Sequence, residues 1–177
     1  VDGHTGADDQ QALVAAWILP EVIHACRVPA ASPLIGSTRE HSGLEREYHL
    51  HMLAVWEDGD LLPAPWRHTR FAAGQQLALT GAPEDVARFR ADFGLEALAG
   101  AGAFAQLHAS TAAAFAELVV PPRSRLVGSS LRQIAFRRRF GVEPIVLYSG
   151  GHQRRGDFSD LPLAAGCTLV VHGLVER

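Results

Sequence analysis

Residues 28–37 read Val-Pro-Ala-Ala-Ser-Pro-Leu-Ile-Gly-Ser, and residues 120–129 read Val-Pro-Pro-Arg-Ser-Arg-Leu-Val-Gly-Ser. An alignment at this offset of 92 residues extends without gaps over residues 25–84 and 117–176, where 14 of the 60 aligned pairs are identical. Glycines and aromatic side chains recur at equivalent positions, which the Ala-rich composition does not explain. The repeat predicts one structural unit that occurs twice in the chain.

Each unit has the pattern of an α/β (α+β) fold in the order β-α-β-β-β. Apolar runs, each bounded by Pro or Gly, predict the strands, and the clearest of these runs are nearly continuous, as in strands buried on both faces. A Ser after each conserved Gly is a typical helix N-cap. We expect strands at 23–28, 50–56 and 75–80 with a helix at 38–48, then strands at 115–120, 142–148 and 167–172 with a helix at 130–140. Turns at 58–59 and 150–151 predict hairpins, each followed by a short polar strand.

The remaining segments are predicted to be helical. We expect an N-terminal lead-in at 1–22, a first domain at 23–84, a helical linker at 85–114 and a second domain at 115–177. Val86, Phe89 and Phe93 form one stripe of a helix over 84–93 that Gly94 ends, and a second helix is expected at 103–114. A unit of about 60 residues buries too little surface to be stable alone, so we expect the two copies to share a core or to pack on a partner chain.

The composition is that of a globular protein with no general affinity for nucleic acid: 47% of residues are hydrophobic, 20% are charged, and the net charge is −3. Cys26 and Cys167 are too few for a disulfide framework and are expected to be buried thiols in a reducing compartment. The apolar run at 12–19 is interrupted by Pro20 and Glu21, so it does not predict a membrane span. The chain starts at Val1 rather than Met, and we expect it to be a piece of a longer protein.

The second copy resembles the RCK_C (TrkA_C) domain family. Residues 121–132 read Pro-Pro-Arg-Ser-Arg-Leu-Val-Gly-Ser-Ser-Leu-Arg, residues 136–142 read Phe-Arg-Arg-Arg-Phe-Gly-Val, and an apolar strand and a Gly-Gly turn follow. The first copy keeps this frame but has Arg39-Glu40-His41-Ser42 in place of the usual Leu-Arg start of the helix, and His49 in place of the Gly. The two copies cover about two thirds of the chain.

The resemblance implies regulation and not catalysis. Domains of this family are cytosolic ligand-sensing modules of potassium channels, potassium uptake systems, cation/proton antiporters and some sodium-coupled anion symporters. They form dimers, and a small ligand, often cyclic di-AMP, binds where two copies meet. We therefore expect a cytoplasmic regulatory module at the inner face of the cell membrane, attached to a potassium or cation transport protein. The alternatives are a tandem insert of a sodium-coupled anion symporter, or a structural assembly module without a ligand.

The residues expected to bind a nucleotide or another anion lie in the second copy. Arg137 and His152 correspond to positions that contact cyclic di-AMP in the family, and Arg154 and Arg155 lie close to His152 in the sequence. Guanidinium groups suit bidentate binding of phosphate. Glu143, however, stands where the family usually has Asn, and its carboxylate would repel a phosphate.

The charges of the two copies also permit a simpler interpretation. Positions 117–176 carry a charge of +3 and positions 25–84 a charge of −2, which favours direct attraction between the copies. The arginines would then form a solvated face or salt bridges to the first copy, as either an intrachain pseudo-dimer or a homodimer.

No metal or catalytic site is expected. His49 and His51 could share a strand face, but nine scattered His residues make chance pairs common. Asp157 and Asp160 are expected to cap turns in a Gly-containing loop. The sequence has no nucleophile placed beside a base.

Overall fold

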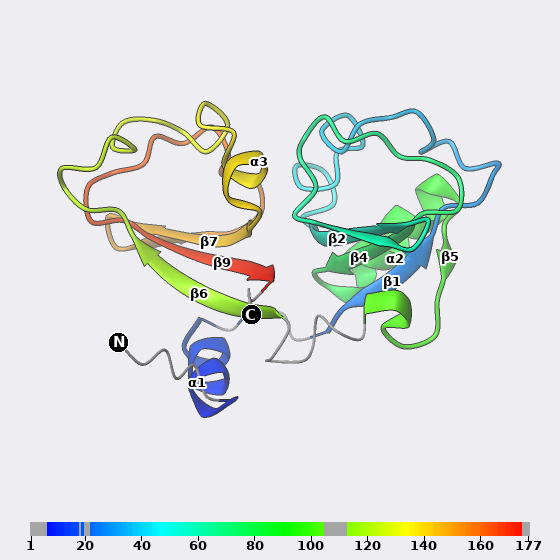
Figure 1. Cartoon of the computed structure of the whole chain (residues 1–177), viewed down its shortest axis with the longest axis horizontal. Helices are drawn as coiled ribbons and strands as arrows, with labels where there is room; N and C mark the ends of the chain where they lie inside the picture. The colour runs from blue at the N-terminus through cyan, green and yellow to red at the C-terminus, as the bar shows by residue number, and fades with distance from the viewer. Residues whose placement is uncertain (1–6, 18, 20–21, 105–112, 175–177) are drawn as a thin grey trace.

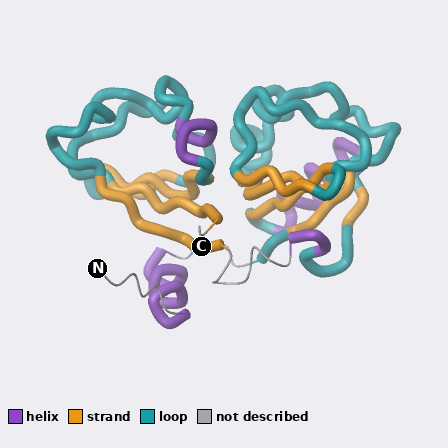
Figure 2. Tube along the Cα trace, viewed as in Figure 1, coloured by secondary structure: helices purple, strands orange, loops and turns teal. Residues whose placement is uncertain are grey.

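The computed structural model describes residues 7–17, 19, 22–104 and 113–174. Two antiparallel β-sheets lie side by side, and long loops cover the same side of both (Figures 1 and 2). We call the two halves lobe 1, which holds the first sheet, and lobe 2, which holds the second. The α+β class predicted from the sequence is confirmed.

Lobe 1 contains a five-stranded sheet with the strand order β3-β2-β4-β1-β5. One helix, α2, connects β4 to β5 and packs against this lobe. The elements are β1 (His24–Arg27), β2 (His51–Glu57), β3 (Asp60–Pro63), β4 (Gln76–Thr80), α2 (Pro83–Phe93) and β5 (Glu96–Ala97).

Lobe 2 repeats this topology without a counterpart of β5. Its sheet has the order β6-β9-β7-β8, which corresponds strand for strand to β1-β4-β2-β3. The elements are β6 (Ala113–Val119), α3 (Phe136–Phe140), β7 (Glu143–Ser149), β8 (His152–Arg154) and β9 (Thr168–Leu174). The irregularities repeat too: the strand register shifts between Met52 and Ala54 and again between Pro144 and Val146. The sequence repeat is therefore a structural repeat.

The helices expected at 38–48 and 130–140 are largely wrong. Residues 39–48 form consecutive turns, and in lobe 2 only the five residues of α3 are helical. The equivalent residues Gly43 and Ala135 both have left-handed backbones, with φ of 72° and 50°. Because a left-handed residue interrupts the ladder of helical hydrogen bonds, neither segment can continue as one helix.

The segment between the two repeats contains the first of its two predicted helices but not the second, as far as the structure describes it. The helix predicted at 84–93 is confirmed as α2, and Gly94 ends it with a left-handed backbone whose N–H donates to the Arg90 carbonyl. The helix predicted at 103–114 is wrong where it can be tested, because residues 113–114 belong to strand β6 and residues 103–104 lie in a 3-10 turn. Residues 105–112 lie outside the described part of the chain.

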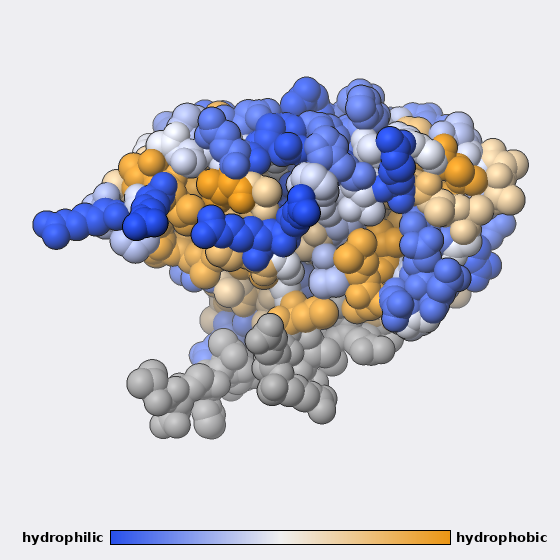
Figure 3. Space-filling model, turned by 45° about the horizontal axis from the view of Figure 1, so that its top comes forward, coloured by the Kyte–Doolittle hydropathy of each residue, from blue (hydrophilic) through white to orange (hydrophobic). Residues whose placement is uncertain are grey.

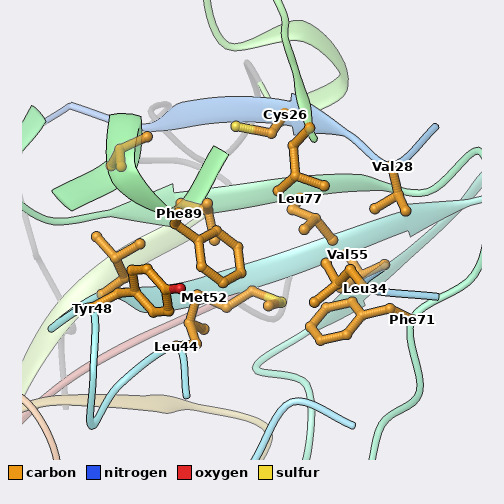
Figure 4. Packing of buried hydrophobic residues seen from close by; sticks show 14 residues of the cluster. Cys26, Val28, Leu34, Leu44, Tyr48, Met52, Val55, Phe71, Leu77 and Phe89 are labelled. Atoms are coloured by element: carbon orange, nitrogen blue, oxygen red, sulfur yellow. The ribbon is translucent and has the colours of Figure 1, made fainter. Parts of the chain in front are cut away.

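The described residues form three apolar clusters. The first lies between sheet 1, its covering loops and α2, and Figure 4 shows Phe89 of α2 beside Tyr48 and Met52. The third is the equivalent cluster of lobe 2, around Leu131, Phe136 and Phe158. Each of these two clusters fills one face of one sheet.

The second cluster is shared by the two lobes. Leu53 and Ala54 of β2 and Ala78 of β4 meet Ile145, Val146 and Val170, which are their equivalents 92 residues later. Helix α1 (Ala7–Trp17) contributes Leu13, Val14 and Trp17, which pack against the same cluster. The expectation that the copies share a core is confirmed, and it explains how two small units are stable in one chain.

Helix α1 also protects the outer strand of sheet 2. The Gln10 side chain donates to the Phe115 carbonyl and accepts from the Phe115 N–H, both at 2.9 Å. The Phe115 backbone of strand β6 thus has partners on its outer side, as the equivalent strand β1 has from β5. Among the described residues, no helix is long and apolar enough to cross a bilayer.

Candidate functional site

The two lobes meet through charged side chains as well as through the shared core. Four of them form a closed network, which we call the Arg–Glu quartet: Arg39 and Glu45 from lobe 1, and Arg137 and Glu143 from lobe 2. Arg39 and Glu45 come from the turns that replace the first predicted helix, Arg137 lies on α3, and Glu143 begins β7. The segments that differ most from the expected helix thus build the contact between the lobes.

Each arginine of the quartet binds both carboxylates. Arg39 Nη2 lies 2.6 Å from Glu143 and 2.7 Å from Glu45, and Arg137 lies 2.8 Å from Glu143 and 3.0 Å from Glu45. Arg39 Nη1 also donates to the carbonyl of Pro65 at 2.7 Å. Arg39 is 2% exposed and Glu143 is fully buried, so these ion pairs are shielded from water.

Burial and pairing act in opposite directions on the ionisation of the quartet. Burial by itself would raise the pKa of Glu143, but Arg137 and Arg39, helped by a hydrogen bond with His51, hold the pKa far below its usual range. Burial would likewise lower the pKa of Arg137, whereas Glu143 and Glu45 raise it above its usual value. Pairing thus outweighs burial and favours the charged forms of Glu143 and Arg137.

Three contacts between the lobes join residues that are 92 positions apart and are therefore equivalent in the repeat. They are Glu45 with Arg137, Glu40 with Arg132, and His51 with Glu143 at 3.4 Å. Equivalent residues contact each other only near an axis that relates two copies by an approximate two-fold rotation. The lobes are arranged in this way, and Arg, Glu and His lie along the axis.

Further ion pairs surround the axis. Arg46 of lobe 1 lies 3.2 Å from Asp157 and 3.7 Å from Asp160 of lobe 2, and Arg132 also binds Asp160 at 2.6 Å. Asp157 accepts the N–H of Ser159, so it caps a turn as expected. Figure 3 shows hydrophilic residues gathered over the loop side of the molecule. Of the ion pairs between the lobes, Glu40 with Arg132 and Glu45 with Arg137 have the polarity that the net charges predict, whereas Arg46 with Asp157 has the reverse polarity.

A cavity of about 410 Å³ opens between the lobes beside the quartet. Its wall includes Arg39, Glu45 and Arg137, together with Trp66, Arg67 and Phe136. Among the described residues, Arg67 has no carboxylate partner: its guanidinium donates to His68 and to the Arg132 carbonyl, and it lies beside the Trp66 ring. Within the part of the chain that the structure describes, the buried indole N–H of Trp66 has no hydrogen-bond acceptor.

The structure separates the four residues that the sequence suggested as a ligand site. Arg137 lines the cavity, and its Nε and Nη2 atoms already bind Glu143 and Glu45. His152 and Arg154 are exposed on the edge strand β8. Arg155 donates to the Trp17 carbonyl and to Gln153. Of the four residues, His152, Arg154 and Arg155 are not part of the cavity wall. A role of the four in ligand binding stays a prediction.

Sequence reasoning missed Arg39, Glu45 and Arg67 as members of the site. One signal was present in the alignment of the two copies, where the charge reverses between Glu45 and Arg137 and between Glu40 and Arg132. Such reversals indicate contact only when the copies are known to be related by a two-fold axis. His51, weighed as a metal ligand, instead bonds Glu143, and the described residues contain no cluster of three or more metal-ligating side chains.

Comparisons with known proteins identify transporters as relatives. A scan against models of protein families finds none that matches the chain. The uncharacterized transporter sll0640 of Synechocystis is 24% identical over 91% of the chain and 27% of its own length. Sodium/sulfate cotransporter 1 of Chlamydomonas reinhardtii is 26% identical over 85% of the chain and 19% of its own length. The chain thus spans about a fifth to a quarter of these relatives.

The comparison with solved structures finds an RCK_C domain dimer and an RCK domain. The RCK_C domain dimer of S. agalactiae BusR in complex with c-di-AMP is 16% identical, with a TM-score of 0.40, and the similarity covers 43% of this chain and 94% of that one. The GsuK RCK domain is 12% identical, with a TM-score of 0.38, over 81% of this chain and 59% of that one.

Proposed function

We propose that this chain is the regulatory, ligand-sensing part of a membrane transport protein and lies in the cytoplasm at the inner face of the membrane. A small anionic ligand binds in the cavity between the lobes and changes how they meet. The similarity to transporters extends over most of the chain, while the chain spans only a fraction of each transporter. This coverage is expected if the chain is one module of a longer transport protein.

One observation supports a ligand in the cavity above all. Arg67 lines it without a carboxylate partner among the described residues, whereas the neighbouring Arg39, Arg132 and Arg137 are all paired. A guanidinium in a partly enclosed cavity suits a phosphate or carboxylate group. The indole N–H of Trp66 would gain a partner from an acceptor group that enters beside it. The RCK_C resemblance of the second copy makes cyclic di-AMP or another nucleotide the first candidate.

Such a ligand would act by linkage. The quartet and the shared core hold one arrangement of the lobes, and a ligand that prefers a different spacing shifts the equilibrium by its difference in affinity. The attached transporter would respond to that shift. No catalytic step is part of this proposal.

The sequence first suggested a potassium or cation transport system. The names of the relatives favour the alternative, a sodium-coupled anion transporter. Sodium/sulfate cotransporters account for several of the relatives. Uptake assays on the full-length protein in proteoliposomes separate the two. Sodium-dependent sulfate uptake supports the first assignment, and rubidium uptake without sulfate transport supports the second.

Thermal unfolding of the chain with a panel of ligands tests the sensing role. The panel consists of cyclic di-AMP, AMP, NAD, sulfate and phosphate. A ligand at 100 times its Kd stabilises the folded chain by about 2.7 kcal/mol, which raises Tm by several degrees. Arg67→Gln should abolish the shift, and Arg125→Gln, at an exposed arginine outside the cavity, should preserve it. A shift lost in His152→Ala/Arg154→Gln instead would place the ligand on β8. Flat curves across the panel favour the structural assembly role.

A further inference from the structure

The contacts along the two-fold axis are complementary in charge, not symmetric. In a dimer of identical domains, a residue on the axis faces its own copy, so every charged axis residue meets a like charge. Here the equivalent residues have diverged in charge: Glu45 faces Arg137 and Glu40 faces Arg132. At both positions, like charges would repel each other in a symmetric dimer, whereas in this chain opposite charges form an ion pair.

From these pairs we infer that the axis face of each lobe accepts only the opposite lobe as its partner, and rejects a second copy of itself. The occupant of the lobe 1 face is lobe 2, of the same chain or of another copy of this chain. This inference does not depend on whether a ligand binds in the cavity.

Pairing of two copies of lobe 1 would bring together groups that repel or fail to pair. Glu45 would face Glu45, Glu40 would face Glu40, and Arg39 would lose Glu143. Like charges in direct contact across an interface cost several kcal/mol and suppress the wrong partner. The Arg39 guanidinium, 2% exposed, would keep only Glu45 as a carboxylate partner.

Pairing of two copies of lobe 2 meets the same obstacle with the sign reversed. Arg137 would face Arg137 and Arg132 would face Arg132, and two fully buried Glu143 side chains would approach each other without Arg39. Position 131, which corresponds to Arg39, is the buried apolar Leu131 in lobe 2. Each Glu143 would keep Arg137 of its own lobe as its only arginine partner, just as each Arg39 would keep only Glu45 in the pair of lobe 1 copies.

Site-specific crosslinking of the full chain tests this inference, because axis positions self-contact only in a symmetric dimer. Glu40 and Arg132 are suitable because both are partly exposed and the quartet stays intact when they are replaced. The native Cys26 and Cys167 are buried, so a short bismaleimide reports on the introduced thiols, and the wild-type chain is the control. The variants are Glu40→Cys, Arg132→Cys and the double variant Glu40→Cys/Arg132→Cys.

The double variant should give a 40–132 crosslinked peptide in high yield, and neither single variant should form a covalent dimer at micromolar concentration. A 40–132 crosslink within one chain or between two chains supports the inference, since opposite lobes are paired in both. A 40–40 or 132–132 crosslink in a single variant overturns it. Absence of the 40–132 crosslink in the folded double variant also overturns it.

Charge reversal provides a second, independent test. Arg132→Glu places a carboxylate beside Glu40 and Asp160, and Glu40→Arg places a guanidinium beside Arg132. Each single variant should lower Tm by about 2–4 °C or more, the shift that corresponds to about 1 kcal/mol in a chain of this size. The double reversal should melt above both single variants. A double variant that melts below both would show that complementary charge does not select the partner.

Discussion

Glu143 is a fully buried carboxylate that depends on its partners from both lobes. Removing one member of a buried ion network leaves the others charged and unpaired, which costs more than the network contributes as a whole. We expect Glu143→Gln to lower the free energy of unfolding by about 3–5 kcal/mol, measured by urea denaturation at pH 7. Glu96→Gln, which neutralises the exposed partner of Arg27 at 3.8 Å, should cost less than about 1 kcal/mol.

The same carboxylate predicts how stability depends on pH. Its pKa in the folded chain lies far below the value of about 4.3 in an unfolded chain. Its contribution is therefore fully present above about pH 5 and is lost as the pH falls through the unfolded value toward the folded one. Urea titrations between pH 3 and 7 should show wild-type stability falling below pH 5, with a smaller fall in Glu143→Gln. Equal slopes for the two proteins would contradict the buried, charged state of Glu143.

Cys26 and Cys167 should be unreactive thiols in the folded chain. Burial raises the pKa of Cys26 to about 11, against a smaller opposing effect of Arg90, and burial also raises the pKa of Cys167. Since the thiolate is the reactive form, Ellman's reagent at pH 8 should label neither residue until the chain unfolds in denaturant. Labelling of a thiol within seconds in the absence of denaturant would show that its cluster opens locally.

At the scale of the elements, the left-handed residue in the loop before α3 gives a direct prediction. Ala135 has φ of 50°, and its equivalent in lobe 1 is Gly43 at 72°. Ala135→Gly should raise the free energy of unfolding by about 0.5–1 kcal/mol, because glycine adopts this conformation without a steric penalty. Gly43→Ala should do the opposite, because a Cβ is strained at this left-handed backbone. Differential scanning calorimetry measures both changes.

The elements also show what sequence patterns can and cannot predict. Strands β2 and β7 were predictable because a continuous apolar run suits a strand buried on both faces. The turns that replace the helices expected at 38–48 and 130–140 were not predictable. The spacing of apolar residues does not reveal that Gly43 and Ala135 have left-handed backbones. His49 shows the same limit: it replaces Gly141 of the second copy and keeps its positive φ.

For the site, the sequence predicted attraction between the copies but not its geometry. The opposite net charges of the two repeats were visible, and Arg137 was singled out. Arg39 entered only as a departure from the RCK_C pattern, and that departure supplies one of the two arginines that pair with Glu143. The carboxylate partners of Arg39 lie on both lobes. An ion pair across an interface can be predicted only when the orientation of the two copies is known.

For the whole molecule, the shared core predicts that both lobes unfold together. Ile145 is 2% exposed and packs in the cluster that joins the sheets. Ile145→Ala should lower the free energy of unfolding by about 2–5 kcal/mol, whereas Leu62→Ala, at a side chain that is 49% exposed, should change it little. Far-UV circular dichroism and tryptophan fluorescence should report one coincident transition in each protein. Two separated transitions would show that the lobes are energetically independent.

The hydrogen bonds from Gln10 to the Phe115 backbone have a consequence for how the molecule behaves when α1 is lost. Without that side chain, the N–H and C=O of Phe115 would offer unpaired groups along an edge strand on which Leu118 and Val119 are already 42% and 61% exposed. Such an edge is a template for strand addition by a neighbouring molecule. A proteolytic cut that released α1 would therefore leave this edge open to aggregation, and it would also uncover the part of the shared cluster that Leu13, Val14 and Trp17 pack against.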